Sequence, residues 1–350
     1  MDWGMSGSSD SCYLCACEDH DVVATQADLR FFPEDEFRVV RCKSCGLLYT
    51  LPKLCPEVLS KYYPPDYGDY ADDVEGLLAG FDPSKVSISN ARALYGKALY
   101  REILGRPFSR LLGFLAGSVA RAKYFAFGIA ASDALPNFLP FKNSPGTYLH
   151  IGAGSGGRFV QLLHEGWKVS AIDVNKSLME RWGASPSLTT FGQGIRSARF
   201  PDATFDIIHM SHVIEHLSTP VEDLGFLNRW LKADGVFVCV LPLYGTLGWD
   251  SRPAFTYYDV PRHTMHFSMG TLSRLLGRTG FRINKVLHLP YSWGFYFSDF
   301  KRYCLTGRPR DCTLPTIEFQ LMPIRHKLLG YFAWALRSSG NVCVYATKCT

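Results

Sequence analysis

The sequence predicts an α/β protein whose main domain is a doubly wound, mostly parallel sheet. From residue 147 onward, short apolar runs alternate with stretches of helical periodicity, which is typical of successive βα units. A glycine-rich turn directly after the first run supports the same architecture. Strands are expected over 148–151, 169–174, 205–210, 236–241, 281–289 and 341–347. Helices are expected over 158–165, 221–232 and 270–279.

Composition divides the 350 residues into three parts. Residues 1–70 are acidic and rich in turn residues and predict a separate module, whereas residues 71–145 predict a helical connecting segment. Residues 146–350 form the α/β domain, with a helical insertion at about 290–340. The formal net charge is only +5, which excludes the chain-wide basic field of a nucleic-acid-binding protein.

The cysteine content and the N-terminal stretch predict a cytoplasmic location. Eleven cysteines without an apolar leader sequence favour a reducing compartment. Arg121 and Lys123 interrupt the most apolar long stretch, so no membrane span is expected. Basic amphipathic patterns over 97–123 and 321–337 leave peripheral contact with an anionic membrane open. We favour the alternative, a helical cap whose basic faces are solvated.

The glycine-rich turn at 152–157 (GAGSGG) follows the first predicted strand and opens the next helix. Glycines allow a sharp turn and let a ligand approach the backbone without interference from a Cβ atom. Asp173 ends the following strand, where its carboxylate can accept the hydroxyl groups of an adenosine ribose. Dinucleotide and S-adenosylmethionine (SAM) sites share this pattern, so an NAD-dependent oxidoreductase remains an alternative at this point.

Four stretches further along the chain distinguish a SAM site from a dinucleotide site. They are 200–208 (FPDATFDII), 211–217 (SHVIEHL), 231–235 (LKADG) and 261–268 (PRHTMHFS). Together with the glycine turn they resemble the landmarks of class I SAM-dependent methyltransferases, in particular a bacterial group with an N-terminal zinc ribbon. The resemblance departs at Ala233-Asp234, where that group usually has Pro-Gly. It implies a Rossmann-like sheet of seven strands, the last of them antiparallel, and SAM as the cofactor.

The resemblance also implies which residues hold SAM. Backbone amides of the turn would face its methionyl part, Asp173 would bind the ribose, and Ile195 would flank the adenine. Ser211 and His212 would lie beneath the sulfonium. The expected cofactor-binding residues are Gly152, Ala153, Gly154, Ser155, Gly156, Asp173, Val174, Ile195 and Ser211.

Three candidate catalytic residues, His212, Glu215 and His216, are spaced so that a helical turn would project them from one side. A hydroxyl or carbon acceptor must lose a proton, and a histidine suits that task near neutral pH. We expect His216 to be the base, with Glu215 orienting it or binding a substrate hydroxyl. The alternatives are structural bracing and a divalent-metal site, although a hard cation would prefer a carboxylate at position 212.

Aromatic and basic residues gather after the fifth predicted strand, where the loops of this fold roof the acceptor pocket. Such side chains suit a hydroxylated or anionic acceptor. The expected substrate-binding residues are Tyr257, Tyr258, Arg262, His263 and His266. The alternative is a loop whose polar groups are satisfied internally. The acceptor is expected to be a small molecule or a glycan, because the resembling group is frequent in polysaccharide and natural-product pathways, with O-methylation ahead of C- or N-methylation.

Two Cys-x-x-Cys pairs, Cys12 with Cys15 and Cys42 with Cys45, predict a zinc site near the N-terminus. Four thiolates give tetrahedral zinc no open position, which indicates a structural role for the metal in a module too small to fold unaided. Residues 1–70 carry 12 acidic and 6 basic residues, the wrong sign for a phosphate backbone, so an RNA methyltransferase is less favoured. A SAM-binding scaffold without catalysis is a further alternative, and the oligomeric state stays open.

Overall fold

The computed structural model describes residues 10–63, 139, 144–154, 159, 162–163, 165–182, 186–247, 257–289 and 324–349. Several predictions lie outside these residues. They are the helical connecting segment, Ser155 and Gly156 of the glycine turn, the basic stretch 97–123 and most of the insertion at 290–340. Both predicted domain boundaries fall at or beside the undescribed stretches and stay predictions.

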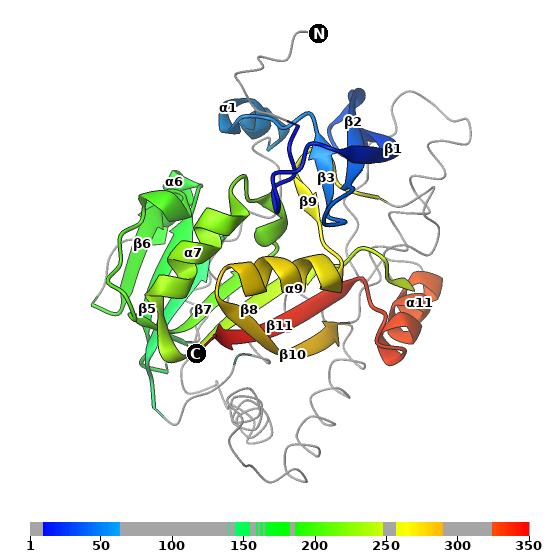
Figure 1. The fold of residues 1–350 in the computed structure, drawn as a ribbon. Helices are drawn as coiled ribbons and strands as arrows, with labels where there is room; N and C mark the ends of the chain where they lie inside the picture. Colours follow the sequence, from blue (N-terminus) through cyan, green and yellow to red (C-terminus); the bar gives the residue numbers. More distant parts are fainter. Residues whose placement is uncertain are drawn as a thin grey trace.

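The main sheet has seven strands in the order β10-β11-β8-β7-β4-β5-β6 (Figure 1). Their bounds are β4 (Thr147–Ile151), β5 (Lys168–Asp173), β6 (Leu188–Gly192), β7 (Phe205–Ser211), β8 (Leu231–Pro242), β10 (Phe281–Leu289) and β11 (Asn341–Lys348). Strands β4 to β8 pair in parallel, whereas β11 runs antiparallel to both of its neighbours. The predicted fold class, including the antiparallel last strand, is confirmed.

Alternate residues of the central strands face two separate apolar cores. Ile208 packs with one core and Ile207 with the other, so strand β7 is buried on both faces, as expected for a parallel strand. The first core includes the apolar faces of α7 (Pro220–Trp230) and α9 (Met269–Arg278), which lie over one face of the sheet in Figure 1. Helix α6 (Lys176–Trp182) contributes to the second core.

Local signals account for where these helices begin. Pro220 occupies the first turn of α7, where a missing N–H costs nothing. Ser268 caps α9: its side chain accepts a hydrogen bond from the Thr271 N–H, and the Thr271 hydroxyl bonds back to the Ser268 amide. Helix α7 ends at Trp230 rather than at the predicted 232, because Leu231 has extended geometry and starts β8.

The N-terminal segment forms its own antiparallel sheet, in the order β1-β2-β3-β9. Strands β1 (His20–Asp28), β2 (Phe32–Cys42) and β3 (Leu48–Leu51) come from this segment, and α1 (Pro56–Leu59) follows them. The fourth strand, β9 (Met265–His266), comes from the chain between β8 and α9 and pairs with β3 (Figure 1). This pairing joins the N-terminal segment to the main domain.

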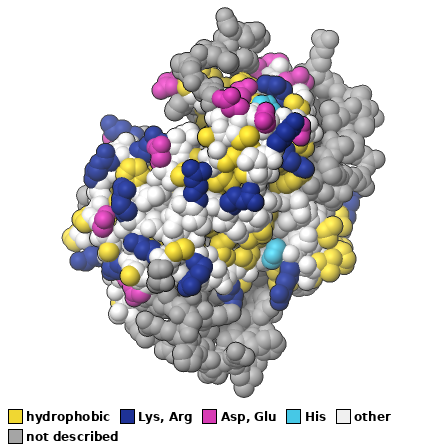
Figure 2. All heavy atoms as spheres, viewed as in Figure 1, with side chains coloured by type: hydrophobic (Ala, Val, Ile, Leu, Met, Phe, Trp, Pro, Cys, Tyr) yellow, Lys and Arg dark blue, Asp and Glu magenta, His cyan; other side chains and the backbone are white. Residues whose placement is uncertain are grey.

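Helix α11 (Ile324–Ala335) covers most of residues 321–337, one of the two basic stretches for which contact with a membrane surface was left open. Its side chains at Leu328, Leu329 and Phe332 are exposed, and Figure 2 shows hydrophobic side chains gathered at this edge of the molecule. Among the described residues, no helix is long and apolar enough to cross a bilayer. Contact with a membrane surface stays a prediction.

A buried ion pair also joins the N-terminal sheet to the loop that precedes β9. The Arg262 guanidinium is 0% exposed and donates to both oxygens of Asp28 on β1, at 2.9 and 2.6 Å. It donates to Asp259 as well, at 3.0 and 2.7 Å. Burial opposes the ionisation of Asp259, but the adjacent guanidinium outweighs it and holds the pKa of that carboxyl well below its usual range. Asp259 therefore stabilises the fold above about pH 4, and this contribution is lost as the pH falls towards the folded-state pKa.

We expect Asp28→Asn to lower the free energy of unfolding by about 3 kcal/mol, because it removes one charge from a buried pair. The matched control is Asp21→Asn on the same strand, whose exposed pair with Lys43 should contribute less than about 1 kcal/mol. Urea denaturation followed by circular dichroism measures both. Equal losses in the two variants would show that the buried contact is not a principal link between the N-terminal sheet and this loop.

Candidate functional site

The glycine turn begins directly after β4 and needs residues without a side chain. Gly152 and Gly154 have positive φ angles of 67° and 54°, a conformation that glycine adopts without strain. A Cβ atom on Gly152 would lie 2.3 Å from Val213 Cγ2, whereas a Cβ on Gly154 would meet none of the described residues within 4 Å. Gly154 lies at the carboxyl end of the sheet, where open α/β sheets bind their ligands.

The described amides of this turn are already hydrogen-bonded within the protein. The Gly152 and Ala153 amides donate to the Ile172 carbonyl at 2.8 and 3.2 Å. The Gly154 amide donates to Asp173 Oδ2 at 2.9 Å. These hydrogens hold the turn against β5, and contact of the turn with a ligand stays a prediction.

Other predicted cofactor residues lie at the ends of neighbouring strands. Asp173 ends β5, is buried, and also accepts a hydrogen bond from the Asn175 amide at 2.8 Å. Val174, the next residue, is 82% exposed, whereas Ile195 is buried in a short 3-10 turn after β6. Ser211 ends β7, and its buried hydroxyl has no hydrogen-bond partner among the described residues. The parallel strands thus bring these residues to one edge of the sheet.

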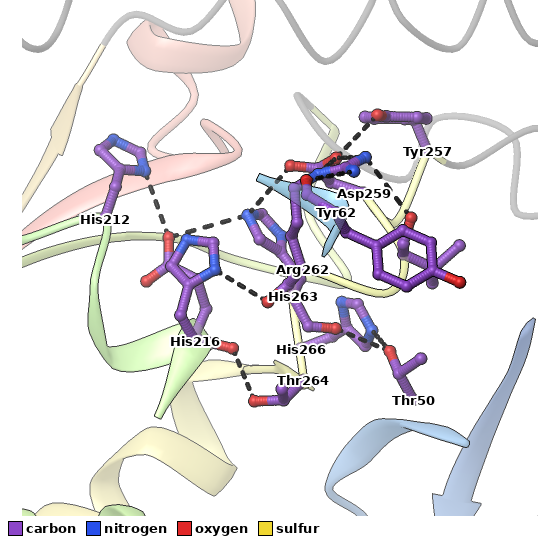
Figure 3. A network of polar contacts seen from close by, with 12 residues as sticks. Thr50, Tyr62, His212, His216, Tyr257, Asp259, Arg262, His263, Thr264 and His266 are labelled. Carbon is purple, nitrogen blue, oxygen red and sulfur yellow. Dashed lines mark hydrogen bonds and ion pairs between the residues drawn. The ribbon is translucent and has the colours of Figure 1, made fainter. Parts of the chain in front are cut away.

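The predicted catalytic trio does not share a helical face. Ile214–His216 is a 3-10 turn, and His212 precedes it with a positive φ of 53°. Glu215 points inward and is 1% exposed, whereas His212 and His216 are partly exposed. His212 Nδ1 lies 3.3 Å from Glu215 Oε1, and Figure 3 shows the histidines of this region converging.

The ring of His216 is oriented by a backbone carbonyl. His216 Nδ1 lies 2.8 Å from the Arg262 carbonyl oxygen, as drawn in Figure 3. Because a carbonyl oxygen can only accept, Nδ1 carries the proton in the neutral ring and Nε2 has the lone pair. Tyr63 Oη lies 3.1 Å from the same Nδ1. This arrangement can present Nε2 as a base.

Buried charges set the protonation states around this ring. Burial opposes the ionisation of Glu215, but the hydrogen bond from His212 and the neighbouring histidine charges lower its pKa to about 2. Burial lowers the pKa of His263 to about 4 and that of His266 well below its usual value. Near neutral pH, an ionised Glu215 therefore lies among neutral buried histidines.

The predicted substrate-binding residues are all buried, and the structure corrects the expectation for one of them. The Arg262 guanidinium is enclosed by Asp28 and Asp259, so it is not placed to grip an anionic acceptor. Tyr257 Oη donates to Asp259 Oδ1 at 2.9 Å, and His266 Nε2 lies 3.1 Å from Thr50 Oγ1. Substrate contacts by Tyr257, Tyr258, His263 and His266 stay predictions.

Sequence reasoning missed several residues that build this region. Asp28 and Tyr63 were not selected, although each contacts a predicted residue. Thr264 was also missed: its hydroxyl and amide donate to the Glu215 carbonyl, at 3.0 and 2.9 Å. No local pattern marks the more distant contacts, since 234 positions separate Asp28 from Arg262.

The four predicted cysteines meet as expected. Their sulfur atoms all lie within 4.8 Å of one another, with Cys12 3.4 Å from Cys45 and Cys15 3.5 Å from Cys42. The two Cys-x-x-Cys turns have the same backbone hydrogen bond. The Ala16 amide donates to the Cys12 carbonyl, and the Gly46 amide donates to the Cys42 carbonyl, both at 2.9 Å. Cys12 and Cys42 sulfurs each accept a backbone N–H at 3.4 Å. Such a cluster could hold a tetrahedral metal ion.

A second group of potential metal donors lies near the base. Glu215, His216 and His263 place one donor atom each within 4.8 Å of one another. A divalent metal at this point would therefore use His263 in place of the predicted His212.

Comparison with known proteins identifies the main domain. Residues 123–286 match the model of the family Methyltransf_23, described as a methyltransferase domain. This part of the chain is therefore a methyltransferase domain. The chain matches no curated protein at a significant level.

Solved structures with a similar fold include two methyltransferases. One, an S-adenosylmethionine dependent methyltransferase from Mesorhizobium loti, is 17% identical, with 59% of this chain and 94% of that chain covered and a TM-score of 0.40. The other is the Burkholderia thailandensis 1,6-didemethyltoxoflavin-N1-methyltransferase with bound 1,6-didemethyltoxoflavin and S-adenosylhomocysteine (SAH). It is 13% identical, with 90% and 96% covered and a TM-score of 0.40. At these scores the likeness extends neither to site residues nor to a substrate.

Proposed function

We propose that this methyltransferase methylates a small-molecule or glycan-type acceptor, with a hydroxyl oxygen favoured over carbon or nitrogen. The observation that carries this proposal is the contact between His216 Nδ1 and the Arg262 carbonyl, which leaves Nε2 as the basic nitrogen. A hydroxyl acceptor needs such a base, because its oxygen must lose a proton as it gains the methyl group.

SAM would lie across the carboxyl ends of β4, β5 and β7, where it supplies a methyl group activated by a sulfonium. None of the described residues would block a ligand that approaches the turn at Gly154. Asp173 keeps lone pairs on both oxygens for ribose hydroxyls, since each oxygen accepts one backbone N–H. Exposed Val174 and buried Ile195 offer apolar contacts to the adenosine, and Ser211 offers a hydroxyl without a partner among the described residues.

His216 would take the acceptor proton at Nε2 as the oxygen attacks, and would later release it to solvent. The resulting imidazolium lies next to the ionised Glu215 and retains the Arg262 carbonyl as acceptor for its Nδ1–H. Both groups favour the charged ring, because a negative charge and a hydrogen-bond acceptor stabilise a cation in a poorly solvated site. The alternative is a divalent metal held by Glu215, His216 and His263.

The four cysteines are proposed to bind a structural zinc ion. Burial raises the pKa of Cys12 to about 11, whereas for Cys42 hydrogen bonds outweigh burial and lower the pKa to about 7. A divalent metal favours the thiolate form and would compensate for the burial of these sulfurs. Zinc with four thiolates keeps no open position, which excludes catalysis by this ion.

Freshly purified protein is expected to contain about one zinc ion per chain. Cys45→Ser should lose most of it and unfold at a lower temperature, because the ligand set is broken. Cys17→Ser is the control, since the Cys17 sulfur bonds only weakly to the Asp19 carbonyl at 3.8 Å. Plasma mass spectrometry measures the metal. Less than half an equivalent in unchelated wild-type protein would contradict the proposal.

Calorimetric titration with SAH tests the cofactor site. Asp173→Ala should raise the dissociation constant about a hundredfold, because two ribose hydrogen bonds are lost and the Gly154 amide is freed. Asp202→Ala, an exposed aspartate on the same domain, should leave the affinity unchanged. Similar dissociation constants for wild type and Asp173→Ala would place the cofactor elsewhere.

His216→Ala tests the base. In a screen of hydroxylated acceptors, turnover should fall about a hundredfold while SAH affinity is retained, because only proton removal is lost. Wild-type turnover should also fall as the pH decreases, because a protonated ring cannot act as a base. Turnover that survives in His216→Ala would reject the base. An absence of turnover in every protein, with SAH binding intact, would favour a non-catalytic scaffold.

A further inference from the structure

Tyr63 connects the N-terminal segment to the proposed base. It follows the 3-10 turn Ser60–Tyr62, and its hydroxyl lies 3.1 Å from His216 Nδ1. The two rings meet edge to face, with centroids 6.4 Å apart. The N-terminal segment therefore reaches the candidate active site with a polar side chain, although 153 positions separate the two residues.

The neighbours of Tyr63 hold it in this place. The Tyr63 amide donates to the Ser60 carbonyl at 3.1 Å. Tyr62 packs edge to face against Phe32 and Phe37 of β2, and its hydroxyl donates to Asp35 at 2.8 Å. The Tyr62 carbonyl accepts from the Arg262 guanidinium at 3.3 Å. The backbone at 62–63 is thus tied both to β2 and to the residue whose own carbonyl orients His216.

Two oxygen atoms share the same histidine proton. The Arg262 carbonyl and the Tyr63 hydroxyl lie 2.8 and 3.1 Å from Nδ1, and the carbonyl can only accept. The Nδ1–H therefore points to both, and the Tyr63 hydroxyl acts as the second acceptor. When Nε2 gains a proton, the ring becomes cationic and its Nδ1–H bonds strengthen, because charge-assisted hydrogen bonds are stronger than neutral ones.

We propose that Tyr63 is a positioning residue for His216, which accepts the Nδ1–H beside the Arg262 carbonyl and stabilises the protonated ring. The acid–base site is then built jointly by the N-terminal segment and the methyltransferase domain. This inference rests on the proposed role of His216 as the base. The other titratable groups near this ring include Glu215, His212, His263 and His266, and they are unchanged in the variants below.

The test compares Tyr63→Phe with Tyr62→Phe in the full-length, zinc-loaded protein. Each variant removes one hydroxyl and keeps the ring, but only the Tyr63 hydroxyl contacts His216. Histidines are labelled with ¹⁵N and ¹³C, and the His216 signals are assigned by their loss in His216→Gln. In the wild type, the neutral ring should carry its proton on Nδ1.

In Tyr63→Phe, the affinity of the His216 ring for a proton should fall about threefold, because one acceptor of the charged form is lost. Tyr62→Phe should match the wild type. SAH affinity checks that each variant is folded. Tyr63→Gln is the second variant, because its side-chain carbonyl can replace the lost acceptor and should restore the wild-type titration in part.

Identical His216 titrations in the wild type and Tyr63→Phe would overturn the inference. So would an equal change in Tyr62→Phe, since that would show a general effect of the N-terminal segment. These outcomes differ from failure of the proposed function. If His216→Ala keeps its turnover, His216 is not the base, whatever the titrations show. If His216→Ala loses its turnover but the His216 titration is unchanged in Tyr63→Phe, only the role of Tyr63 is rejected.

Discussion

The buried guanidinium of Arg262 is the contact on which the candidate site depends. It lies between Asp28 of the N-terminal sheet and Asp259 of the loop before β9, and water reaches none of the Arg262 side chain. Removing either carboxylate would leave part of a buried charge uncompensated, which is costly in a protein interior. The ion pair therefore holds the loop 259–263 in one place, and with it the carbonyl that orients His216.

Burial also explains why neighbouring groups of the same kind differ in charge. His263 and His266 are uncharged at neutral pH, because the interior does not solvate a cation and burial lowers the pKa of both rings. Glu215 is equally buried, yet the hydrogen bond from His212 keeps it ionised. Unlike His263 and His266, His216 is partly exposed, and its Nδ1–H is occupied, so it combines access with a lone pair on Nε2. The site thus contains one histidine that can act as a base, and the neighbouring buried groups brace it.

The N-terminal segment has two roles in this arrangement. Its cysteines form a compact cluster whose two turns repeat the same backbone hydrogen bonds, which suits a metal that stabilises a small sheet. Its strand β3 pairs with β9, and its last described residues contact Arg262 and His216. A segment that resembles a detachable module in sequence is therefore part of the wall around the proposed base.

Patterns of near neighbours along the chain were enough to predict most strands of the main sheet, helix α9, the glycine turn and the cysteine pairs. Each depends on residues a few positions apart, or on apolar periodicity within one element. The roles of Arg262, Tyr63 and Asp28 could not be predicted in this way, since residue type alone suggested an arginine that binds an anionic substrate. Their partners lie 153 to 234 positions away, and no local preference encodes such a meeting. The sequence by itself thus determined which chemical groups are present. Tertiary packing decided which of these groups are buried against each other, and burial in turn decides which of them stay charged.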